Sequence, residues 1–251
     1  MNKPYLSVVV PCFDEMANLQ KGVLDKIEHF LNKKQFSYQV IIVDDGSTDG
    51  SVEFVKRFIQ DNSNFKLIEN SHLGKGGAVT AGVLKSEGEY VLFADMDQAT
   101  PIEELDKLLP YFDQGFDVVI GSRSGVRKGS PFIRQFVSHG AIVARKLIVG
   151  IKDISDTQCG FKAFKQEAAR KLFTRINKLH NGFKKISGSS VSSGFDVELL
   201  FIAEKLGYKI KEVPVNWLYV ETRRVSPIKD SIEGFLDLLR IKIKAWKGEY
   251  D

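Results

Sequence analysis

The sequence predicts an α/β fold in which helices flank a mostly parallel β-sheet. Short runs of β-branched and apolar residues alternate with amphipathic stretches over the first 120 residues, a pattern typical of repeated βα units. Polar clusters follow four successive strand candidates. The composition, 43% hydrophobic and 27% charged over 251 residues, is that of an ordinary folded protein. We therefore expect one domain over residues 1–251, with different roles for residues 1–121 and 122–251.

The strand candidates of the first half are bounded by polar or turn-forming residues. They are Leu6–Pro11, Gln39–Asp44, Phe65–Glu69, Tyr90–Ala94 and Asp117–Gly121. Helices are predicted between them near residues 17–32, 50–61, 76–86 and 101–112. In the second half the pattern predicts helices near 131–149, 166–174, 195–206 and 231–246, a loop at 174–193 and a short strand within 208–217. The helices at 131–149 and 231–246 are expected to be amphipathic.

Charge is distributed unevenly along the chain. Residues 1–120 contain 11 Lys and Arg against 19 Asp and Glu, a net charge of −8, whereas residues 121–251 contain 25 against 13, a net charge of +12. A basic half is typical of binding to nucleic acid, an anionic membrane or a phosphorylated substrate, although a solvated lysine-rich surface is the commoner explanation. Nucleic acid fits poorly, because no aromatic residues are interleaved and the strand ends are acidic.

Targeting signals are not apparent in the sequence. No apolar run is long enough to cross a membrane, and the N-terminal MNKPYLSVVVP lacks the charged-then-apolar order of a secretory signal. We expect a cytoplasmic location. Cys12 and Cys159 are far apart in sequence and are expected to be reduced packing residues.

The fourth strand candidate ends in DMD, which contributes two aspartates. Asp95 and Asp97 are two residues apart, so their side chains lie on the same side of an extended segment. Two carboxylates together with substrate phosphates are a common setting for Mg²⁺. A D-x-D alone is weak evidence, since one aspartate can cap the helix that follows at Pro101 and the other can be solvated. The position after a buried strand is what favours a cation site.

Two further strand ends carry residues suited to a nucleotide. Asp45 follows the second strand, where its carboxylate can accept hydrogen bonds from a base or a ribose, although a capped turn is an alternative. Lys75, in GKGGA, lies among glycines before a helix, where backbone N–H groups and a cation can meet a phosphate. The sequence contains neither a Walker A motif nor G-x-G-x-x-G after the first strand. These features indicate a nucleotide whose diphosphate meets a metal.

The basic half provides candidates for binding a second phosphate. Arg123 follows the fifth strand and Arg134 lies in a predicted helix, and the planar guanidinium of arginine suits phosphate oxygens. Arg224, in ETRRVSP, is a weaker candidate. The four histidines show no metal-ligand spacing.

These segments together resemble the family 2 glycosyltransferases of the GT-A fold, and within them the polyprenyl-phosphate transferases of the dolichyl-phosphate β-glucosyltransferase type. The resemblance is carried, in the family's order, by SVVVPCFDE, VIIVDDGSTDGS, GKGGAVTAGV, LFADMDQATPIEEL, DVVIGSR, DTQCGFKAF, GFDVELLFIAEKLGYKIKEVPVNW and SPIKDSI. It implies a GT-A domain whose residues 1–121 bind a nucleotide-sugar and whose residues 122–251 bind the acceptor. The implied reaction is inverting transfer of a hexose, with UDP-glucose as the expected donor, onto a polyprenyl phosphate.

The resemblance also implies roles for particular residues. Asp95 and Asp97 would hold Mg²⁺ or Mn²⁺, and the catalytic candidates are Asp97, Arg123 and Arg134. The remaining nucleotide-sugar pocket would be formed by Pro11, Asp14, Glu15, Asp45 and Lys75. Arg123, Arg134 and Arg224 would receive the lipid phosphate, and the sugar-pocket or structural candidates are Asp156, Gln158, Asp196 and Glu198. Such an acceptor needs positioning more than deprotonation, because a phosphate monoester is already an anion.

Other functions are compatible with the same motifs. A soluble family 2 transferase acting on a polysaccharide or protein glycan would need a carboxylate base, for which Asp196 or Glu198 is available. A GDP-mannose-dependent polyprenyl-phosphate mannosyltransferase and a nucleotide-sugar-binding module without turnover are further alternatives. Many family members carry a transmembrane segment, so peripheral attachment to the cytoplasmic face of a membrane would here rest on the amphipathic helices and the basic half.

Overall fold

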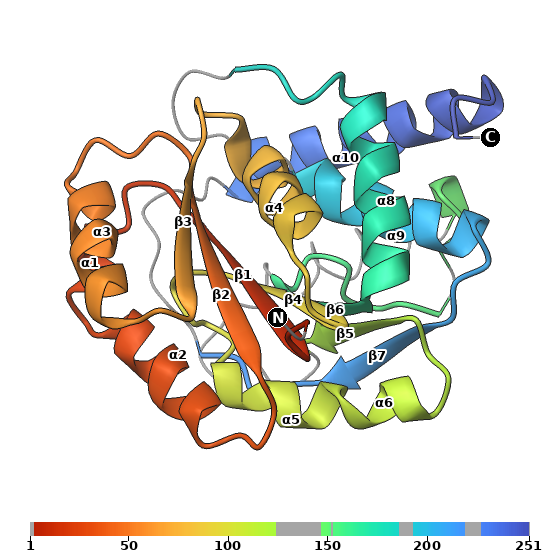
Figure 1. Cartoon of the computed structure of the whole chain (residues 1–251). Helices are drawn as coiled ribbons and strands as arrows, with labels where there is room; N and C mark the ends of the chain where they lie inside the picture. Colours follow the sequence, from red (N-terminus) through yellow and green to blue (C-terminus); the bar gives the residue numbers. More distant parts are fainter. Residues whose placement is uncertain (1–2, 124–146, 152, 186–192, 219–226, 251) are drawn as a thin grey trace.

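The computed structural model describes residues 3–123, 147–151, 153–185, 193–218 and 227–250, and contains one seven-stranded sheet (Figure 1). The strands are β1 (Leu6–Cys12), β2 (Tyr38–Asp44), β3 (Phe65–Glu69), β4 (Tyr90–Ala94), β5 (Val118–Ser122), β6 (Phe161–Lys165) and β7 (Ile210–Pro214). Their order is β3-β2-β1-β4-β6-β5-β7. The pairs β1–β2, β1–β4, β2–β3 and β5–β7 are parallel, and β6 runs antiparallel to both neighbours. The predicted α/β class with a mostly parallel sheet is confirmed.

Helices cover both faces of the sheet. One face is covered by α2 (Val23–Asn32), α3 (Ser51–Asp61), η1 (Ile102–Glu104), α5 (Leu105–Leu108) and α6 (Pro110–Asp113), and α1 (Met16–Leu19) lies at its edge beside α3. The other face is covered by α4 (Gly74–Lys85), α8 (Gln166–Leu179) and α9 (Ser193–Lys205), and α10 (Pro227–Trp246) packs against α9. No helix in these described segments combines the length and apolarity needed to cross a bilayer.

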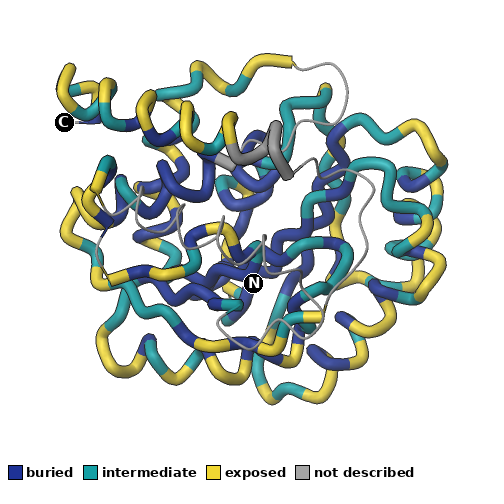
Figure 2. The backbone as a smooth tube through the Cα atoms, turned by 180° about the vertical axis from the view of Figure 1, so that it is seen from behind, coloured by how far each residue is buried: buried dark blue, intermediate teal, exposed yellow. Residues whose placement is uncertain are grey.

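The alternation of side chains along the strands explains the two cores. In β1, Val8 and Val10 belong to the cluster under α2, whereas Val9 between them belongs to the cluster under α4. Because both faces are covered, β4 is apolar and buried along its whole length and β1 is buried except at Pro11, and Figure 2 shows the buried centre of the molecule. Both cysteines are free and buried, and burial raises the pKa of the Cys12 thiol to about 12, which fits packing residues.

Two predicted helices differ in the structure, and one strand was not predicted. The helix predicted over 17–32 is two helices, because Gly22 adopts a left-handed conformation (φ 72°) that interrupts the first. The helix predicted over 101–112 is three short pieces, and the last begins at Pro110, which has no N–H to continue a helix. The strand β6 was not predicted, because Lys162 interrupts its apolar pattern.

Other boundaries depend on which residues are described. The helix α8 continues to Leu179, so the first residues of the predicted 174–193 loop are helical. Residues 186–192 lie outside the described segments, as do residues 131–146 of the amphipathic helix predicted at 131–149. The helix predicted over 231–246 is present as α10 and begins earlier, at Pro227.

Candidate active site

The carboxyl ends of β1 and β4 form the centre of the candidate site. From β1 the chain continues to β2 and β3 on one side, whereas β4 lies on the other side of β1. In open parallel sheets this reversal of strand order leaves a crevice beyond the strand ends, where ligands bind. The loops after β1, β2 and β4 and the first turn of α4 lead to this edge. They contain six of the predicted site residues, namely Asp14, Glu15, Asp45, Lys75, Asp95 and Asp97.

Asp45, directly after β2, anchors the start of α4. Its Oδ1 accepts the N–H of Leu73 at 2.8 Å and its Oδ2 accepts the N–H of Gly74 at 2.7 Å. Nδ1 of His72 lies 2.8 Å from the Asp45 carbonyl oxygen, and the imidazole stacks on Phe13 with ring centroids 4.3 Å apart. These contacts connect the loops after β1 and β2 to α4. The buried Asp45 carboxylate therefore holds the backbone at the start of α4 in place, in addition to lying in the predicted nucleotide pocket.

Three more of the predicted nucleotide-pocket residues lie in β1 or directly after it. Pro11 lies in β1 and is half-buried. Asp14 has a positive φ of 51°, and its N–H donates to the hydroxyl of Ser47 at 2.9 Å. The Glu15 carboxylate accepts a hydrogen bond from Asn18 at 2.5 Å. The structure thus holds Asp14 and Glu15 in a fixed loop beside the end of β2.

Asp95, Asp97 and Lys75 meet where β4 ends and α4 begins. Nζ of Lys75 lies 2.6 Å from Oδ1 of Asp95, and Oδ1 of Asp97 accepts the N–H of Ala99 at 3.0 Å. Burial raises the pKa of Asp97, and the charge of Asp95 raises it further, while the Ala99 N–H and Lys75 oppose the rise. Burial would lower the pKa of Lys75, but the carboxylates of Asp95, Asp196 and Asp97 outweigh burial and raise it.

Gly160, directly before β6, contacts Asp95 closely. The Asp95 N–H donates to the Gly160 carbonyl at 3.2 Å. A Cβ added to Gly160 would lie 1.9 Å from Oδ2 of Asp95, which is far inside van der Waals contact. Only glycine at this position leaves room for the Asp95 side chain where it is.

A divalent cation fits these residues as a partner of two protein carboxylates. Within the described segments, no group of three or more His, Cys, Asp or Glu side chains is close enough together to hold a metal ion by itself. Mg²⁺ in nucleotide sites, however, takes one or two carboxylates and completes its coordination with phosphate oxygens and water. The half-buried carboxylate of Asp97 has a raised pKa, and the charge of Asp95 contributes to the rise. A divalent cation would offset the negative charge of this pair.

Arg123 and Asp156 form a bidentate ion pair at the end of β5. Nε and Nη2 of Arg123 donate to the two Asp156 oxygens at 2.7 and 2.8 Å, and the Arg123 N–H donates to Oδ2 at 3.0 Å. Burial would raise the pKa of Asp156, but Arg123 outweighs burial and holds it at about 2. The guanidinium also lies 5.9 Å from the Trp217 ring. The side chain of Gln158 is exposed, and its N–H donates to Asp156 at 3.2 Å.

Asp196 and Glu198 lie two positions apart on α9 and have different partners. Asp196 is buried, and its Oδ1 accepts a hydrogen bond from Nζ of Lys162 at 2.6 Å. Glu198 pairs with His180 at 2.6 Å and Lys244 at 3.0 Å and also accepts the Tyr250 hydroxyl. Glu198 therefore joins α8, α9 and α10, whereas Asp196 lies near Lys75.

Two predicted site residues cannot be placed, and three residues of the site were not predicted. Arg134 and Arg224 lie outside the described residues. Sequence reasoning missed His72, Gly160 and Lys162. The signal for Lys162 was a lysine within the otherwise apolar FKAF. Gly160 and His72 gave none, because their importance depends on contacts with strands distant in sequence.

Two solved glycosyltransferases have folds similar to that of this chain. Glucosyl-3-phosphoglycerate synthase from Mycobacterium tuberculosis, solved with Mn²⁺, UDP and glucosyl-3-phosphoglycerate, matches with a TM-score of 0.61 and 20% identity over 95% of this chain and 80% of its own. A mannosyltransferase from Pyrobaculum calidifontis, solved with GDP-Man and Mn²⁺, matches with a TM-score of 0.58 and 16% identity over 99% of this chain and 75% of its own. These comparisons establish the fold, which is the GT-A fold that the chain shares with these enzymes.

Sequence comparison identifies the family. Residues 7–173 match the sequence profile of the family described as Glycosyl transferase family 2, and the chain belongs to that family. It is similar to the dolichyl-phosphate beta-glucosyltransferase of Dictyostelium discoideum, with 35% identity over 97% of this chain and 76% of that protein. The Homo sapiens protein of the same name is 33% identical over 97% of this chain and 78% of its own length.

Proposed function

We propose that the protein is an inverting hexosyltransferase that moves glucose from UDP-glucose onto a dolichyl-type polyprenyl phosphate. The observation that carries this proposal is the meeting of Asp95, Asp97 and Lys75 at the end of β4. The relatives named above support the sugar and the acceptor, since each is named a dolichyl-phosphate beta-glucosyltransferase.

On the donor side, Asp95 and Asp97 would hold Mg²⁺ or Mn²⁺. The cation would stabilise the charge that develops on the leaving diphosphate. Lys75, at the first turn of α4, adds a fixed ammonium beside the same oxygens, and the N-terminus of that helix favours negative charge. Pro11, Asp14, Glu15 and Asp45 belong to the loops that border the nucleotide on the β1–β2 side.

On the acceptor side, Arg123 is placed to orient a phosphate monoester. Its bidentate bonds to Asp156 fix the plane of the guanidinium and employ Nε and Nη2. The acceptor oxygen would attack C1 of the sugar as the bond from C1 to the diphosphate breaks, which inverts the anomeric centre. The phosphate arrives ionised, so the reaction needs no side-chain base.

The partners of the two α9 carboxylates support a phosphate acceptor over a glycan hydroxyl. A hydroxyl acceptor would need a carboxylate free to take its proton. Asp196 is bound by the buried ammonium of Lys162, and Glu198 accepts from three side chains. Burial would raise the pKa of Glu198, but its contacts with His180, Tyr250 and Lys244 outweigh burial and lower it to about 2. Neither carboxylate is arranged as a general base.

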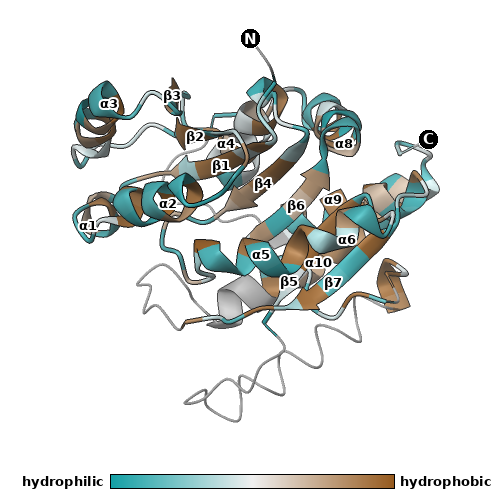
Figure 3. Ribbon diagram, turned by 60° about the horizontal axis from the view of Figure 1, so that its bottom comes forward, coloured by the Kyte–Doolittle hydropathy of each residue, from teal (hydrophilic) through white to brown (hydrophobic). Residues whose placement is uncertain are grey.

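The outward face of α10 supports attachment to a membrane surface. Six apolar side chains, between 37% and 77% exposed, recur at helical spacing along it: Ile232, Phe235, Leu236, Leu239, Ile243 and Trp246. Arg240 and Lys247 flank this stripe on one side and Lys242 on the other. Figures 2 and 3 show α10 at the edge of the molecule, with exposed and apolar positions along it. An apolar stripe with cationic flanks suits the surface of an anionic bilayer, and we assign it to the cytoplasmic face.

A donor panel tests the proposed reaction. Wild-type protein and Asp97→Ala would be incubated with UDP-glucose, UDP-N-acetylglucosamine or GDP-mannose, a short polyprenyl phosphate and Mn²⁺. We expect lipid-linked glucose from UDP-glucose with the wild type and none with the folded variant. Transfer from GDP-mannose alone would identify a mannosyltransferase instead, and nucleotide binding without transfer would identify a binding module.

A further inference from the structure

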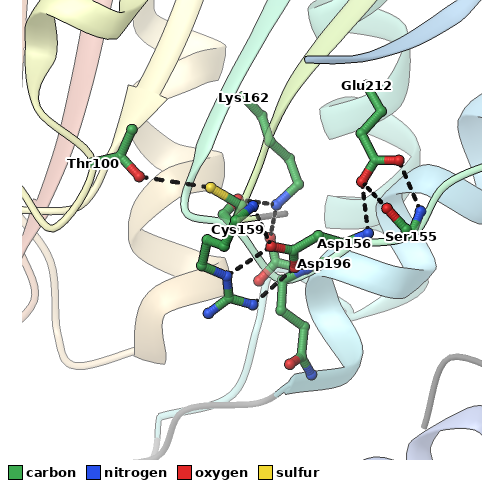
Figure 4. Close-up of polar contacts among 9 residues, drawn as sticks. Thr100, Ser155, Asp156, Cys159, Lys162, Asp196 and Glu212 are labelled. Atoms are coloured by element: carbon green, nitrogen blue, oxygen red, sulfur yellow. Dashed lines mark hydrogen bonds and ion pairs between the residues drawn. The ribbon is translucent and has the colours of Figure 1, made fainter. Parts of the chain in front are cut away.

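Lys162 is a lysine with no solvent-exposed surface, placed in the middle of the sheet. It lies in β6, opposite Phe93 of β4, and its Nζ is 5.2 Å from the centre of that ring. The ammonium donates to the Cys159 carbonyl at 2.6 Å and to Oδ1 of Asp196 at 2.6 Å, as Figure 4 shows. A buried charge is costly unless it is paired and hydrogen-bonded. The two contacts of the Lys162 ammonium offset this cost, and each of them leads to a residue of the candidate site.

The first contact of Lys162 leads to Asp95. The Cys159 carbonyl that accepts from Lys162 belongs to the peptide unit that leads into Gly160. Gly160 in turn accepts the Asp95 N–H and leaves no room for a Cβ beside the Asp95 carboxylate. The ammonium therefore fixes the piece of backbone against which a predicted metal ligand rests.

The second contact leads to Lys75. Asp196 lies in the first turn of α9, and the neighbouring Phe195 packs so closely on α4 that a Cβ at Gly76 would lie 2.9 Å from its ring. The charges of Asp95 and Asp196 both favour the ammonium of Lys75. Positive and negative groups thus alternate from Lys162 through Asp196 and Lys75 to Asp95.

We propose that Lys162 is a positioning residue for the transfer: it fixes Asp95 through the Cys159–Gly160 backbone and holds Asp196 beside Lys75, without touching the substrate. This inference rests on the proposed function, because it assigns Asp95 to the metal and the diphosphate. Groups that orient metal ligands typically change metal affinity by about 10- to 100-fold when they are removed.

A purely structural role is the alternative, and the same strand offers a matched control. Lys165, three residues further along β6, forms a half-exposed ion pair with Asp117 at 3.2 Å. Lys165→Met removes a lysine from the same strand without touching the Cys159–Gly160 backbone. A role in folding alone would leave the metal affinity of the folded fraction unchanged.

The experiment compares Asp196→Asn with Lys162→Met/Asp196→Asn. Both lack the Asp196 charge, so their difference reports Lys162 alone, and neither buries an unpaired carboxylate. Mn²⁺ binding in the presence of UDP, and separately of GDP, would be titrated by electron paramagnetic resonance. Neither ligand carries the hexose that would be transferred, so a direct role of Asp196 toward that hexose does not enter. Circular dichroism checks folding.

We expect the double variant to bind Mn²⁺ with nucleotide at least about tenfold more weakly than Asp196→Asn, and Lys165→Met to match the wild type. Equal affinities of folded Asp196→Asn and the double variant would overturn the inference and leave the proposed function intact. Should the double variant not fold, Gly160→Ala tests the same route, because its Cβ would displace the Asp95 carboxylate. Wild-type affinity of folded Gly160→Ala would likewise overturn the inference. Absence of Mn²⁺–nucleotide binding by the wild type would contradict the proposed function itself.

Discussion

Nζ of Lys75 lies 2.6 Å from Oδ1 of Asp95, so that the first turn of α4 is tied directly to the end of β4. The ammonium of Lys75 also acts on Asp97. Burial and Asp95 raise the pKa of Asp97, and Lys75 opposes part of this rise. Lys75 therefore helps keep Asp97 ionised, which is the state in which a carboxylate binds a metal.

Lys75→Met should move the acid limit of metal binding to higher pH. Without the ammonium the pKa of Asp97 rises further, so protons compete with Mn²⁺ at higher pH than in the wild type. Mn²⁺ titrations with UDP across a pH series would measure the midpoint of this loss. Lys75→Arg, which keeps the charge, should leave the midpoint close to that of the wild type. An unchanged midpoint in Lys75→Met would contradict the proposed effect of Lys75 on Asp97.

Asp97→Asn should abolish transfer and yet stabilise the metal-free protein at neutral pH. Because burial raises the pKa of Asp97, ionising this carboxyl costs stability, and the cost appears as pH rises through the raised pKa. Asparagine avoids it but is a poor metal ligand, so transfer should fall by at least about 100-fold. Thermal unfolding without metal and the transfer assay measure the two effects. Asp106→Asn, at a more exposed carboxylate paired with Lys34, should change neither, and a lower unfolding temperature for Asp97→Asn would argue against the burial cost.

Asp156→Asn should weaken both the acceptor site and the fold. The pKa of about 2 means that this carboxylate contributes stability above its unfolded pKa, and the contribution is lost as pH falls toward 2. Loss of the bidentate partner of Arg123 should cost about 1–3 kcal/mol and raise the KM for polyprenyl phosphate more than the KM for UDP-glucose. Urea unfolding and steady-state kinetics measure these effects.

Asp153→Asn is the control for that experiment, because Asp153 is exposed and lies three residues away. Equal increases in both KM values for Asp156→Asn would indicate a general disturbance of the site and not an acceptor role for Arg123.

Glutamates on the apolar stripe of α10 should release the protein from membranes. Phe235→Glu and Leu239→Glu place carboxylates among exposed apolar side chains, so the folded protein should tolerate them. Sedimentation with phosphatidylserine-containing vesicles should show at least about tenfold weaker binding, and high salt should weaken wild-type binding. Leu206→Glu, at an exposed leucine beyond the end of α9, is the matched control. Vesicle binding that survives the stripe variants would exclude α10 as the docking surface.

The sequence predicted most of the sheet, because strand periodicity and strand-end polar clusters are local features. The strands β3 and β4 were predicted with the bounds that the structure has, and the Asp95–Asp97 pair was located from its position after β4. The strand β6 and its buried Lys162 could not be predicted in this way. Their stability depends on pairing with β4 and on a carboxylate from α9, which lie far away in sequence.

The same limit applies to the partners of the predicted site residues. That Asp45 holds the start of α4, and that Asp156 binds Arg123, follow from contacts across the strand ends that no local pattern specifies. Glu198 was grouped with Asp196 from sequence, yet the two carboxylates have separate partners, because neighbouring positions on a helix face different directions.

The account is tested most directly by one transfer measurement with labelled UDP-glucose. Wild-type protein would be given polyprenyl phosphate or the matching polyprenol, each with Mn²⁺ or with EDTA, and the lipid fraction would be counted. We predict labelled lipid only when both the acceptor phosphate and the metal are present. Equal labelling of the polyprenol, or full labelling in EDTA, would contradict the proposed roles of Arg123 and of the Asp95–Asp97 pair.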